Sequence, residues 1–289
     1  MATDAHCSEL GVASHPATRL HQLAGDLAVT GRLLTASNAS FVASCTTPDG
    51  DVQLVYKPIR GERELWDFPS GSLAGREVAA YRMSAAGGFD VVPYTTMVDG
   101  PFGPGSAQVW VHQHEEDAVD EPDADDTDEP GEREPTSADD LVDVVAPERI
   151  PDGWHPVLYG EDERAELVAV VHADDARLRR LAVFDALINN ADRKAGHLLV
   201  DAGHVLGCDH GLSFHVDDKL RTLLWGWAGQ PLTEQEVAMV RAAADATDAV
   251  TDLVTRDEVA RLRDRAAALV RDGLPTPRAG GPAVPWPLW

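Results

Sequence analysis

The chain has 289 residues, of which 44% are hydrophobic and 25% are charged, and its formal net charge is −25 at pH 7. This composition is that of a globular protein with enough apolar residues for a sizeable core, and the excess of acid argues against a broad electrostatic surface for nucleic acid or anionic lipid. The chain has no run of 18 apolar residues, so we expect no integral membrane segment, and its three widely spaced cysteines (Cys7, Cys45 and Cys208) indicate a cytoplasmic protein without a disulfide framework.

The first part of the chain is rich in predicted strands. Alternating or β-branched apolar residues predict strands at 27–34, 40–47 and 52–58. One clear helix is expected at 73–88, with Val78, Tyr81 and Met83 or Ala85 on its buried face and a glycine pair at its end. A further strand is expected at 106–114.

Residues 115–140 form a low-complexity segment with 14 acidic residues and one basic residue. Such a segment buries too little apolar surface to offset the entropy of ordering it, so we expect a disordered, solvated loop. A regulatory role, such as contact with a protein partner, is the alternative.

The part of the chain after this loop is expected to be mostly helical. A helix is predicted at 174–190, with Leu178, Leu181, Ala182 and Ile188 on one face. A hairpin follows, and capping boxes at Thr233-Glu236 and Thr255-Glu258 then begin two more helices, the second ending at Gly273. The tail at 276–289 contains four prolines and two tryptophans, which suggest docking onto the rest of the protein.

Three polar residues flank the hairpin. Asp192 lies in the loop before it, His197 begins its first strand, and Asp209 follows its second strand. Because a hairpin brings its two ends together, two carboxylates and an imidazole are expected to converge, which suits a divalent ion and a base. The alternatives are that Asp192 caps a turn and pairs with Arg193, and that His197 is a hydrogen-bonded buried histidine.

Phosphoryl transfer also requires a cation on the phosphates. Lys57 stands at the end of the third predicted strand, in "LVYKPIR", and Glu77 is 20 residues further on, in the predicted helix, where it can fix that lysine by an ion pair. The alternatives are an ordinary edge-strand lysine and a surface acid.

These residues, in this order, resemble those of the protein-kinase-like fold: a strand lysine, a helix glutamate, a connector strand, then Asp192-Arg193 and Asp209-x-Gly211 around a hairpin. The local sequences are nearest to the phosphatidylinositol 3- and 4-kinases and their atypical relatives, which share K-P after the strand and "REVAAY"-like helices. Over roughly residues 25–275 the chain resembles an actinobacterial family with distant similarity to those lipid kinases. The resemblance implies an α+β fold with two protein-kinase-like lobes, of the lipid-kinase branch, with a β-rich N-lobe and a mainly helical C-lobe.

The resemblance also implies a role for each matching residue. Lys57 would bind the α- and β-phosphates of ATP, and Glu77 would hold Lys57. The turn of Ser37, Asn38, Ala39 and Ser40 would cover the phosphates, and the segment Val109 to His112, with Val111, would line the adenine pocket. Asp192, with Arg193 and Lys194 beside it, would be catalytic, whereas Asp209 and His197 would bind Mg²⁺ or Mn²⁺.

The sequence departs from the family pattern at several of these positions. The turn "ASNASF" lacks glycines, and His197 stands where a metal-binding asparagine is expected. Lys194 replaces the histidine of D-R-H, and His210 replaces the phenylalanine that follows the metal-binding aspartate. Imidazole nitrogen favours Mn²⁺ or Zn²⁺ over Mg²⁺. These changes are therefore expected to affect which metal ion binds and whether, and how fast, the phosphate is transferred.

The resemblance therefore predicts an ATP- and metal-dependent phosphotransferase whose acceptor is an inositol-type or other small hydroxylated compound. In kinases the segment at 221–233 faces the acceptor, so Trp225 and Trp227 would form an aromatic platform for it; the alternative is that they pack in the core under a loop. A catalytically weak nucleotide-binding pseudokinase with a regulatory role, an adenylylating enzyme and a plain interaction protein are the alternatives. The expected organisation is an N-terminal tail (1–24), a nucleotide-binding N-lobe (25–114), the acidic insert (115–145), a catalytic C-lobe (146–275) and a Pro/Trp tail (276–289).

Overall fold

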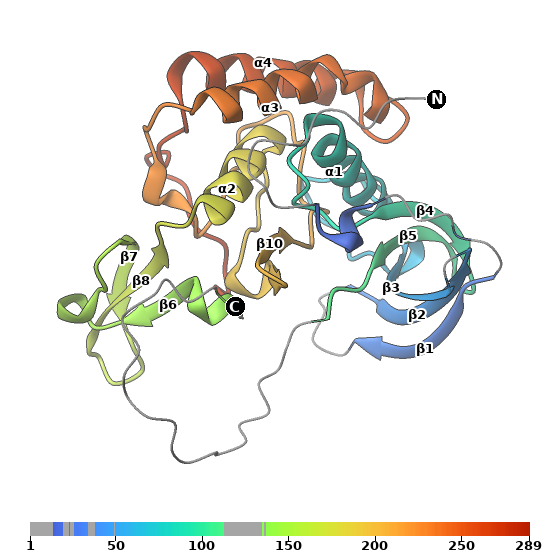
Figure 1. Cartoon of the computed structure of the whole chain (residues 1–289), viewed down its shortest axis with the longest axis horizontal. Helices are drawn as coiled ribbons and strands as arrows, with labels where there is room; N and C mark the ends of the chain where they lie inside the picture. Colours follow the sequence, from blue (N-terminus) through green and yellow to red (C-terminus); the bar gives the residue numbers. More distant parts are fainter. Residues whose placement is uncertain are drawn as a thin grey trace.

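The computed structural model describes residues 14–19, 23, 26–33, 38–48, 50–112, 135 and 137–289. These residues form an α+β fold with a five-stranded sheet, a three-stranded sheet, a two-stranded hairpin and four α-helices. The two larger sheets lie at opposite sides of the molecule, and α2 and the hairpin lie between them (Figure 1). Most of the predicted N-terminal tail lies outside the described residues.

The five-stranded sheet is antiparallel and has the order β1-β2-β3-β5-β4. Its strands are β1 (Ala28–Leu33), β2 (Ser40–Thr47), β3 (Gly50–Pro58), β4 (Thr95–Gly100) and β5 (Gly103–Val109). The three strands expected first in the chain are confirmed. The sequence does not predict β4, which has few apolar residues, and the strand expected at 106–114 begins earlier and ends at Val109 because a tight turn joins it to β4.

The predicted helix after the third strand is α1 (Leu73–Gly87). It ends at Gly88, whose φ of 68° is the left-handed conformation that glycine adopts without steric cost. Val78, Tyr81 and Met83 are buried as expected, whereas Ala85 is exposed. The buried face of α1 therefore includes Met83 and not Ala85.

Charged residues fasten α1 to the helical part of the molecule. Arg76 donates hydrogen bonds of 2.5 Å to the Ser213 carbonyl oxygen and to the Glu258 carboxylate, and all three residues are buried. Further along α1, Arg82 donates to the Asp252 carboxylate at 2.8 Å. These contacts join α1 to elements far away in the sequence.

A three-stranded antiparallel sheet of order β6-β8-β7 corrects two predictions. Its strands are β6 (Val142–Val145), β7 (Trp154–Glu161) and β8 (Leu167–Ala173). The region after the acidic insert is predicted to be mostly helical, without this sheet, and 137–145 is predicted to belong to the disordered insert; both predictions are wrong. In the structure Leu141 and Val142 are buried and β6 pairs with β8, because this end of the segment carries the apolar residues that the acidic run lacks. The run at 113–134, with 136, lies outside the described residues.

The predicted helices and hairpin of the second half are confirmed. They are α2 (Ala176–Ile188), β9 (Leu198–Asp201), β10 (His204–Gly207), α3 (Glu234–Asp245) and α4 (Arg256–Asp272). Thr233 and Thr255 form the expected capping boxes with Glu236 and Glu258. The predicted apolar face of α2 is buried, and its C-cap Asn189 has a φ of 58°. Among the described residues, no helix is long and apolar enough to cross a bilayer.

The C-terminal tail docks through its backbone. The Ala283 carbonyl oxygen accepts hydrogen bonds from Thr222 N and from Trp225 Nε1, and the Leu288 carbonyl oxygen accepts one from Ala195 N. The side chain of Trp286 is exposed. The tail is therefore held by these carbonyl groups and by Val284 and Leu288, which pack against the core, and not by burial of Trp286.

Candidate functional site

Lys57, Glu77 and Asp209 meet at one point, although they come from three different elements. Lys57 lies in β3 opposite Ser106 of β5, Glu77 lies in the first half of α1, and Asp209 follows β10. The Lys57 ammonium group donates to Glu77 Oε1 at 2.7 Å and forms an ion pair with Asp209 Oδ1. We call these three residues the lysine cluster.

The second carboxylate oxygen of Glu77 binds the backbone of His210, which follows the hairpin. Glu77 Oε2 accepts a hydrogen bond of 2.9 Å from His210 N, so one carboxylate contacts both β3 and the residue after Asp209. Asp209 has a φ of 56°, in the left-handed region that aspartate adopts more readily than most residues. Strained backbone of this kind gathers at functional sites, where the surrounding contacts enforce it.

The charges of the lysine cluster stabilise one another. Burial alone would lower the pKa of Lys57, but Asp209 and Glu77 outweigh it and raise this pKa above its ordinary value. Lys57 in turn holds the pKa of Asp209 well below its usual range, against the opposing effect of burial. Asp209 is therefore ionised at neutral pH, and its side chain keeps 45% of its accessible surface.

Asp192 lies in the loop between α2 and the hairpin, as the sequence predicts. Its backbone N–H donates to Asn190 Oδ1 at 3.0 Å, and its carboxylate lies 3.4 Å from Lys194 Nζ. Partial burial raises the pKa of Asp192, and the nearby ammonium group of Lys194 offsets part of this rise. Asp192 is thus a partly desolvated carboxylate with one cation beside it.

His197 lies between the two aspartates. Its Nδ1 donates to the Asp192 carbonyl oxygen at 2.8 Å, because a carbonyl can only accept, and its Nε2 lies 3.4 Å from Asp209 Oδ2. Burial lowers the pKa of His197 to about 4, so the ring is neutral at neutral pH. The Nε2 lone pair therefore faces a carboxylate oxygen, and the alternative of an ordinary hydrogen-bonded histidine accounts for only one of its two ring nitrogens.

Arg193 is not in a position to contact a substrate. It is fully buried and pairs with Asp185 through Nε at 2.8 Å and Nη2 at 3.0 Å. Its guanidinium group also donates to His210 Nε2 at 2.7 Å and to the carbonyl oxygens of His197 and Cys208 at 3.0 Å. The predicted catalytic role of Arg193 is therefore corrected to a positioning role, because every part of its side chain is used within the protein.

We call Asp185, Arg193 and His210 the arginine cluster. Asp185 and Asn190 are not among the predicted site residues, yet both are buried and they are joined by a hydrogen bond of 2.9 Å. Asp185 falls on the apolar face of α2, and an acid in that position is the signal that could have identified it as the partner of a buried base. Gly207 completes the site, since a Cβ atom there would lie 2.7 Å from Arg193 Nη2.

The residues expected to contact the nucleotide are placed as follows. Ser37 lies outside the described residues. Asn38 Oδ1 accepts from Arg63 N at 2.8 Å, and the buried Ser40 hydroxyl donates to the Asn38 carbonyl oxygen at 3.5 Å, so both side chains brace the turn itself. Val109 and Val111 are buried and His112 is exposed, where the chain leaves β5.

The aromatic platform expected of Trp225 and Trp227 does not form from both residues. Trp227 is buried, and its Nε1 donates to Asp174 at 2.7 Å, which agrees with the core-packing alternative. Cys208 is half-buried, and desolvation of its thiol raises the pKa to about 12, which leaves it protonated and unreactive. Within the described ranges, no group of three or more His, Cys, Asp or Glu residues is arranged to hold a metal ion.

Comparison with known proteins gives one close relative and no matching family model. The chain is 45% identical over 272 residues to Protein Rv2133c of Mycobacterium tuberculosis (strain ATCC 25618 / H37Rv), and the match covers 92% of this chain and 93% of that protein. The chain belongs to the same family as Protein Rv2133c.

Proposed function

We propose that the chain is an ATP- and metal-dependent phosphotransferase with a two-lobed, protein-kinase-like fold that resembles the phosphatidylinositol 3- and 4-kinases. The observation that carries this proposal is the convergence of Lys57, Glu77 and Asp209 from a sheet, a helix and a hairpin exit. Phosphoryl transfer requires a fixed cation on the phosphates and a carboxylate for the metal ion, and these three residues supply both. In this reading the five-stranded sheet with α1 is the N-lobe, and the helical part is the C-lobe.

The donor atoms near Asp209 fit a divalent ion bound together with a nucleotide. Asp209 Oδ2 and His197 Nε2 are two acceptors 3.4 Å apart, and a cation between them would remove their mutual repulsion. Because Mg²⁺ in such sites is held by one or two protein groups together with substrate phosphates and water, a third protein ligand is not required. The bound ion would neutralise phosphate charge, and the imidazole nitrogen favours Mn²⁺ over Mg²⁺.

Asp192 would orient the hydroxyl group of the acceptor. Its raised pKa makes it a better proton acceptor than an exposed aspartate, and His197 connects its backbone to the metal side of the site. The resemblance alone suggests an inositol-type or other small hydroxylated acceptor. Lys194, which is half-buried and 3.4 Å from Asp192, is the nearest cation for an anionic group on that acceptor.

The test combines binding and transfer. Purified protein is mixed with ATP and either MgCl₂ or MnCl₂, and the shift in melting temperature is measured together with transfer of label from γ-labelled and α-labelled ATP to inositol, to phosphatidylinositol vesicles and to the protein. We expect γ-label transfer, faster with Mn²⁺. Lys57→Met should lose both the thermal shift and transfer, and Asp192→Asn should keep the shift and lose transfer. Glu163→Gln, at an exposed acid, is the matched control.

Other outcomes overturn the proposal in distinct ways. No nucleotide-dependent shift with either metal would exclude a nucleotide site, whereas transfer of the α-label would identify an adenylylating enzyme.

A nucleotide-binding pseudokinase with a regulatory role is the second candidate. The observation that favours it is the ion pair between Asp192 and Lys194, which occupies the carboxylate that would orient the acceptor. This candidate predicts a thermal shift with ATP, no transfer with any acceptor, and no effect of Asp192→Asn on either measurement.

A further inference from the structure

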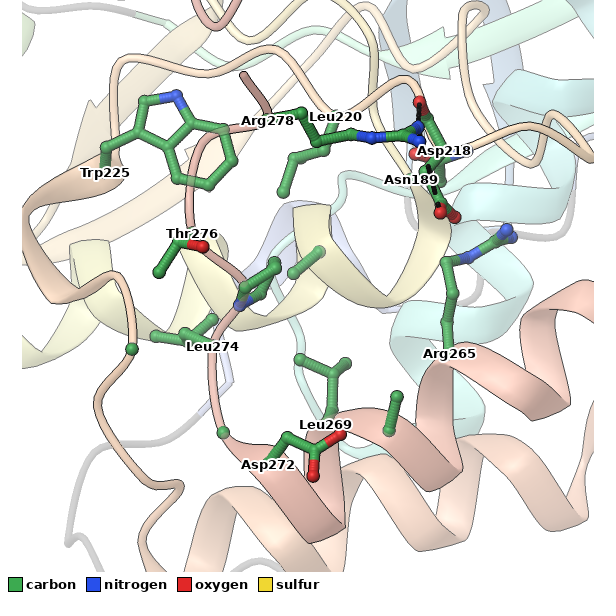
Figure 2. A pocket seen from close by; sticks show the side chains of 15 residues that line it. Asn189, Asp218, Leu220, Trp225, Arg265, Leu269, Asp272, Leu274, Thr276 and Arg278 are labelled. Atoms are coloured by element: carbon green, nitrogen blue, oxygen red, sulfur yellow. Dashed lines mark hydrogen bonds and ion pairs between the residues drawn. The ribbon is translucent and has the colours of Figure 1, made fainter.

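A pocket of about 460 Å³ lies away from the lysine cluster, on the side of the helical region where the last turns of α4 face the end of α2. The segment after Gly211 and the segment after α4 complete its walls. Figure 2 shows Trp225 at one side of this pocket and Arg265 at the other, with Leu220, Leu269 and Leu274 between them. Pockets of about 300–1,000 Å³ are typical of small-molecule sites.

The body of the pocket is apolar. Three leucine side chains and the ring of Trp225 line it, and the Trp225 Nε1 group is already satisfied because it donates to the Ala283 carbonyl oxygen at 2.8 Å. A ligand therefore contacts the aromatic ring without having to supply a partner for its polar edge. This wall suits an aromatic or branched aliphatic group.

The two acidic residues in the walls are neutralised by arginines. Asp218 forms an ion pair with Arg261 at 3.4 Å, and its backbone carbonyl oxygen accepts from Arg278 at 2.8 Å. Asp272 pairs with Arg271 at 2.5 Å. Neither carboxylate therefore leaves an uncompensated negative charge in the pocket.

Among the described residues of the walls, Arg265 is the charged residue without an ion-pair partner. Its Nε and Nη1 donate to the carbonyl oxygens of Leu187 and His215, at 3.1 and 3.2 Å, and its Nη2 is buried without a hydrogen-bond partner. Among the residues that the structure describes, no carboxylate forms an ion pair with it; burial lowers its pKa to about 10, and the more distant carboxylates of Asp218, Asp264 and Glu258 offset only part of this fall. A buried cation without a counter-ion is unfavourable unless an anion joins it.

We propose that this pocket binds a small organic carboxylate, with an apolar or aromatic body against Trp225 and the leucines and its carboxylate group at Arg265. The guanidinium group lies at the edge formed by Asn189 and Asp218, so the anionic end of the ligand belongs at that edge (Figure 2). The inference is independent of the proposed phosphotransferase function, since it uses neither the lysine cluster nor Asp192.

The test compares two ligands of the same shape and different charge. Indole-3-acetate and its neutral counterpart indole-3-acetamide are titrated into the full chain by calorimetry, without nucleotide. The acid should bind at least about tenfold more tightly, as expected for a charge-assisted hydrogen bond. In Arg265→Gln, which keeps amide donors but loses the charge, the two ligands should bind equally.

Two further variants keep the test decisive. Ala268→Trp fills the pocket from α4 and should abolish binding of both ligands, which tests the location even if Arg265→Gln is poorly folded. Arg263→Gln, an exposed arginine on the same helix outside the pocket, is the matched control and should change nothing. Equal affinity for the two ligands in the unmodified protein, no detectable binding, or binding that survives Ala268→Trp would each overturn the proposal.

Discussion

The lysine cluster and the arginine cluster are built from similar charges, but they differ in how completely those charges are used. Arg193 and Asp185 have no accessible surface, and the arginine donates to a carboxylate, a histidine and two carbonyl oxygens. In the lysine cluster, Asp209 is half-exposed and one of its oxygens faces the lone pair of His197. The arginine cluster, in which the polar groups of Asp185 and Arg193 are all hydrogen-bonded within the protein, fixes the backbone. The lysine cluster keeps acceptor atoms that a ligand can use.

The largest effect is expected from breaking the arginine cluster. Asp185→Ala leaves the Arg193 guanidinium group buried without its counter-ion, which should lower the free energy of unfolding by about 3–5 kcal/mol. Urea denaturation measures this change. Asp248→Ala, at an exposed acid with one weak contact to Arg263, should cost less than about 1 kcal/mol. Equal losses for the two variants would mean that burial does not set the arginine cluster apart from an exposed ion pair.

The lysine cluster should respond in activity more than in stability. Glu77→Gln removes a charge-assisted hydrogen bond from Lys57, and the loss of about 1.5–3 kcal/mol of positioning should lower phosphate transfer by roughly 10- to 100-fold. The comparison is made by single-turnover transfer and by urea denaturation of the same preparations, with Glu163→Gln as the control. A variant that unfolds easily but transfers at the normal rate would contradict the assignment.

His172, a buried neutral histidine outside both clusters, has both ring nitrogens hydrogen-bonded within the protein. It therefore tests whether complete hydrogen bonding, as at Arg193, leads to an effect on stability. His172 Nδ1 donates to the Ala173 carbonyl oxygen and its Nε2 accepts from Gly226 N, and burial lowers its pKa to about 4. Between pH 6.5 and pH 4, His172 binds a proton in the unfolded state but stays neutral in the folded state. The contribution of His172 to the free energy of unfolding is therefore fully present above pH 6.5 and is lost as the pH falls to 4.

His172→Gln should remove about 3 kcal/mol of this pH dependence, measured as unfolding free energy at pH 7 and at pH 4. His112→Gln, at an exposed histidine, is the control. An unchanged pH profile in His172→Gln would show that another group causes the loss.

The smallest effect is expected at Lys194, at the edge of the lysine cluster. Lys194 lowers the pKa of Asp192, so Lys194→Gln should raise that pKa further. Transfer that needs the ionised form of Asp192 would then begin at a higher pH, and the acid limb of the pH–rate profile should move upwards by less than about one unit. A shift in the opposite direction would exclude Asp192 as the titrating group.

The sequence predicts the parts of the site that follow from local patterns. Lys57, Glu77, Asp192 and Asp209 are recognisable by their order, and the structure brings Lys57 into contact with both Glu77 and Asp209. The arginine cluster is not predictable in the same way, because Asp185 meets Arg193 only after α2 packs against the hairpin.

The predictions for the fold show the same division. Capping boxes at Thr233 and Thr255 begin helices by contacts within four residues, and both helices are confirmed. The sheet of β6, β7 and β8 depends on pairing between strands that are separated by turns. Because its short strands follow an acidic run, the composition of this region gives no clear strand pattern. The unpartnered nitrogen of Arg265 likewise depends on the packing of α4 against distant carbonyl groups.

The attachment of α1 has a mechanical consequence. Arg76 and Arg82 fasten this helix to Ser213, Glu258 and Asp252, whereas Lys57 belongs to the five-stranded sheet. α1 also packs against β4 and β5, so this one helix links the five-stranded sheet to the helical part of the protein. A pair of fluorescent labels, one on β3 and one on α4, would therefore report how rigidly α1 joins these two parts.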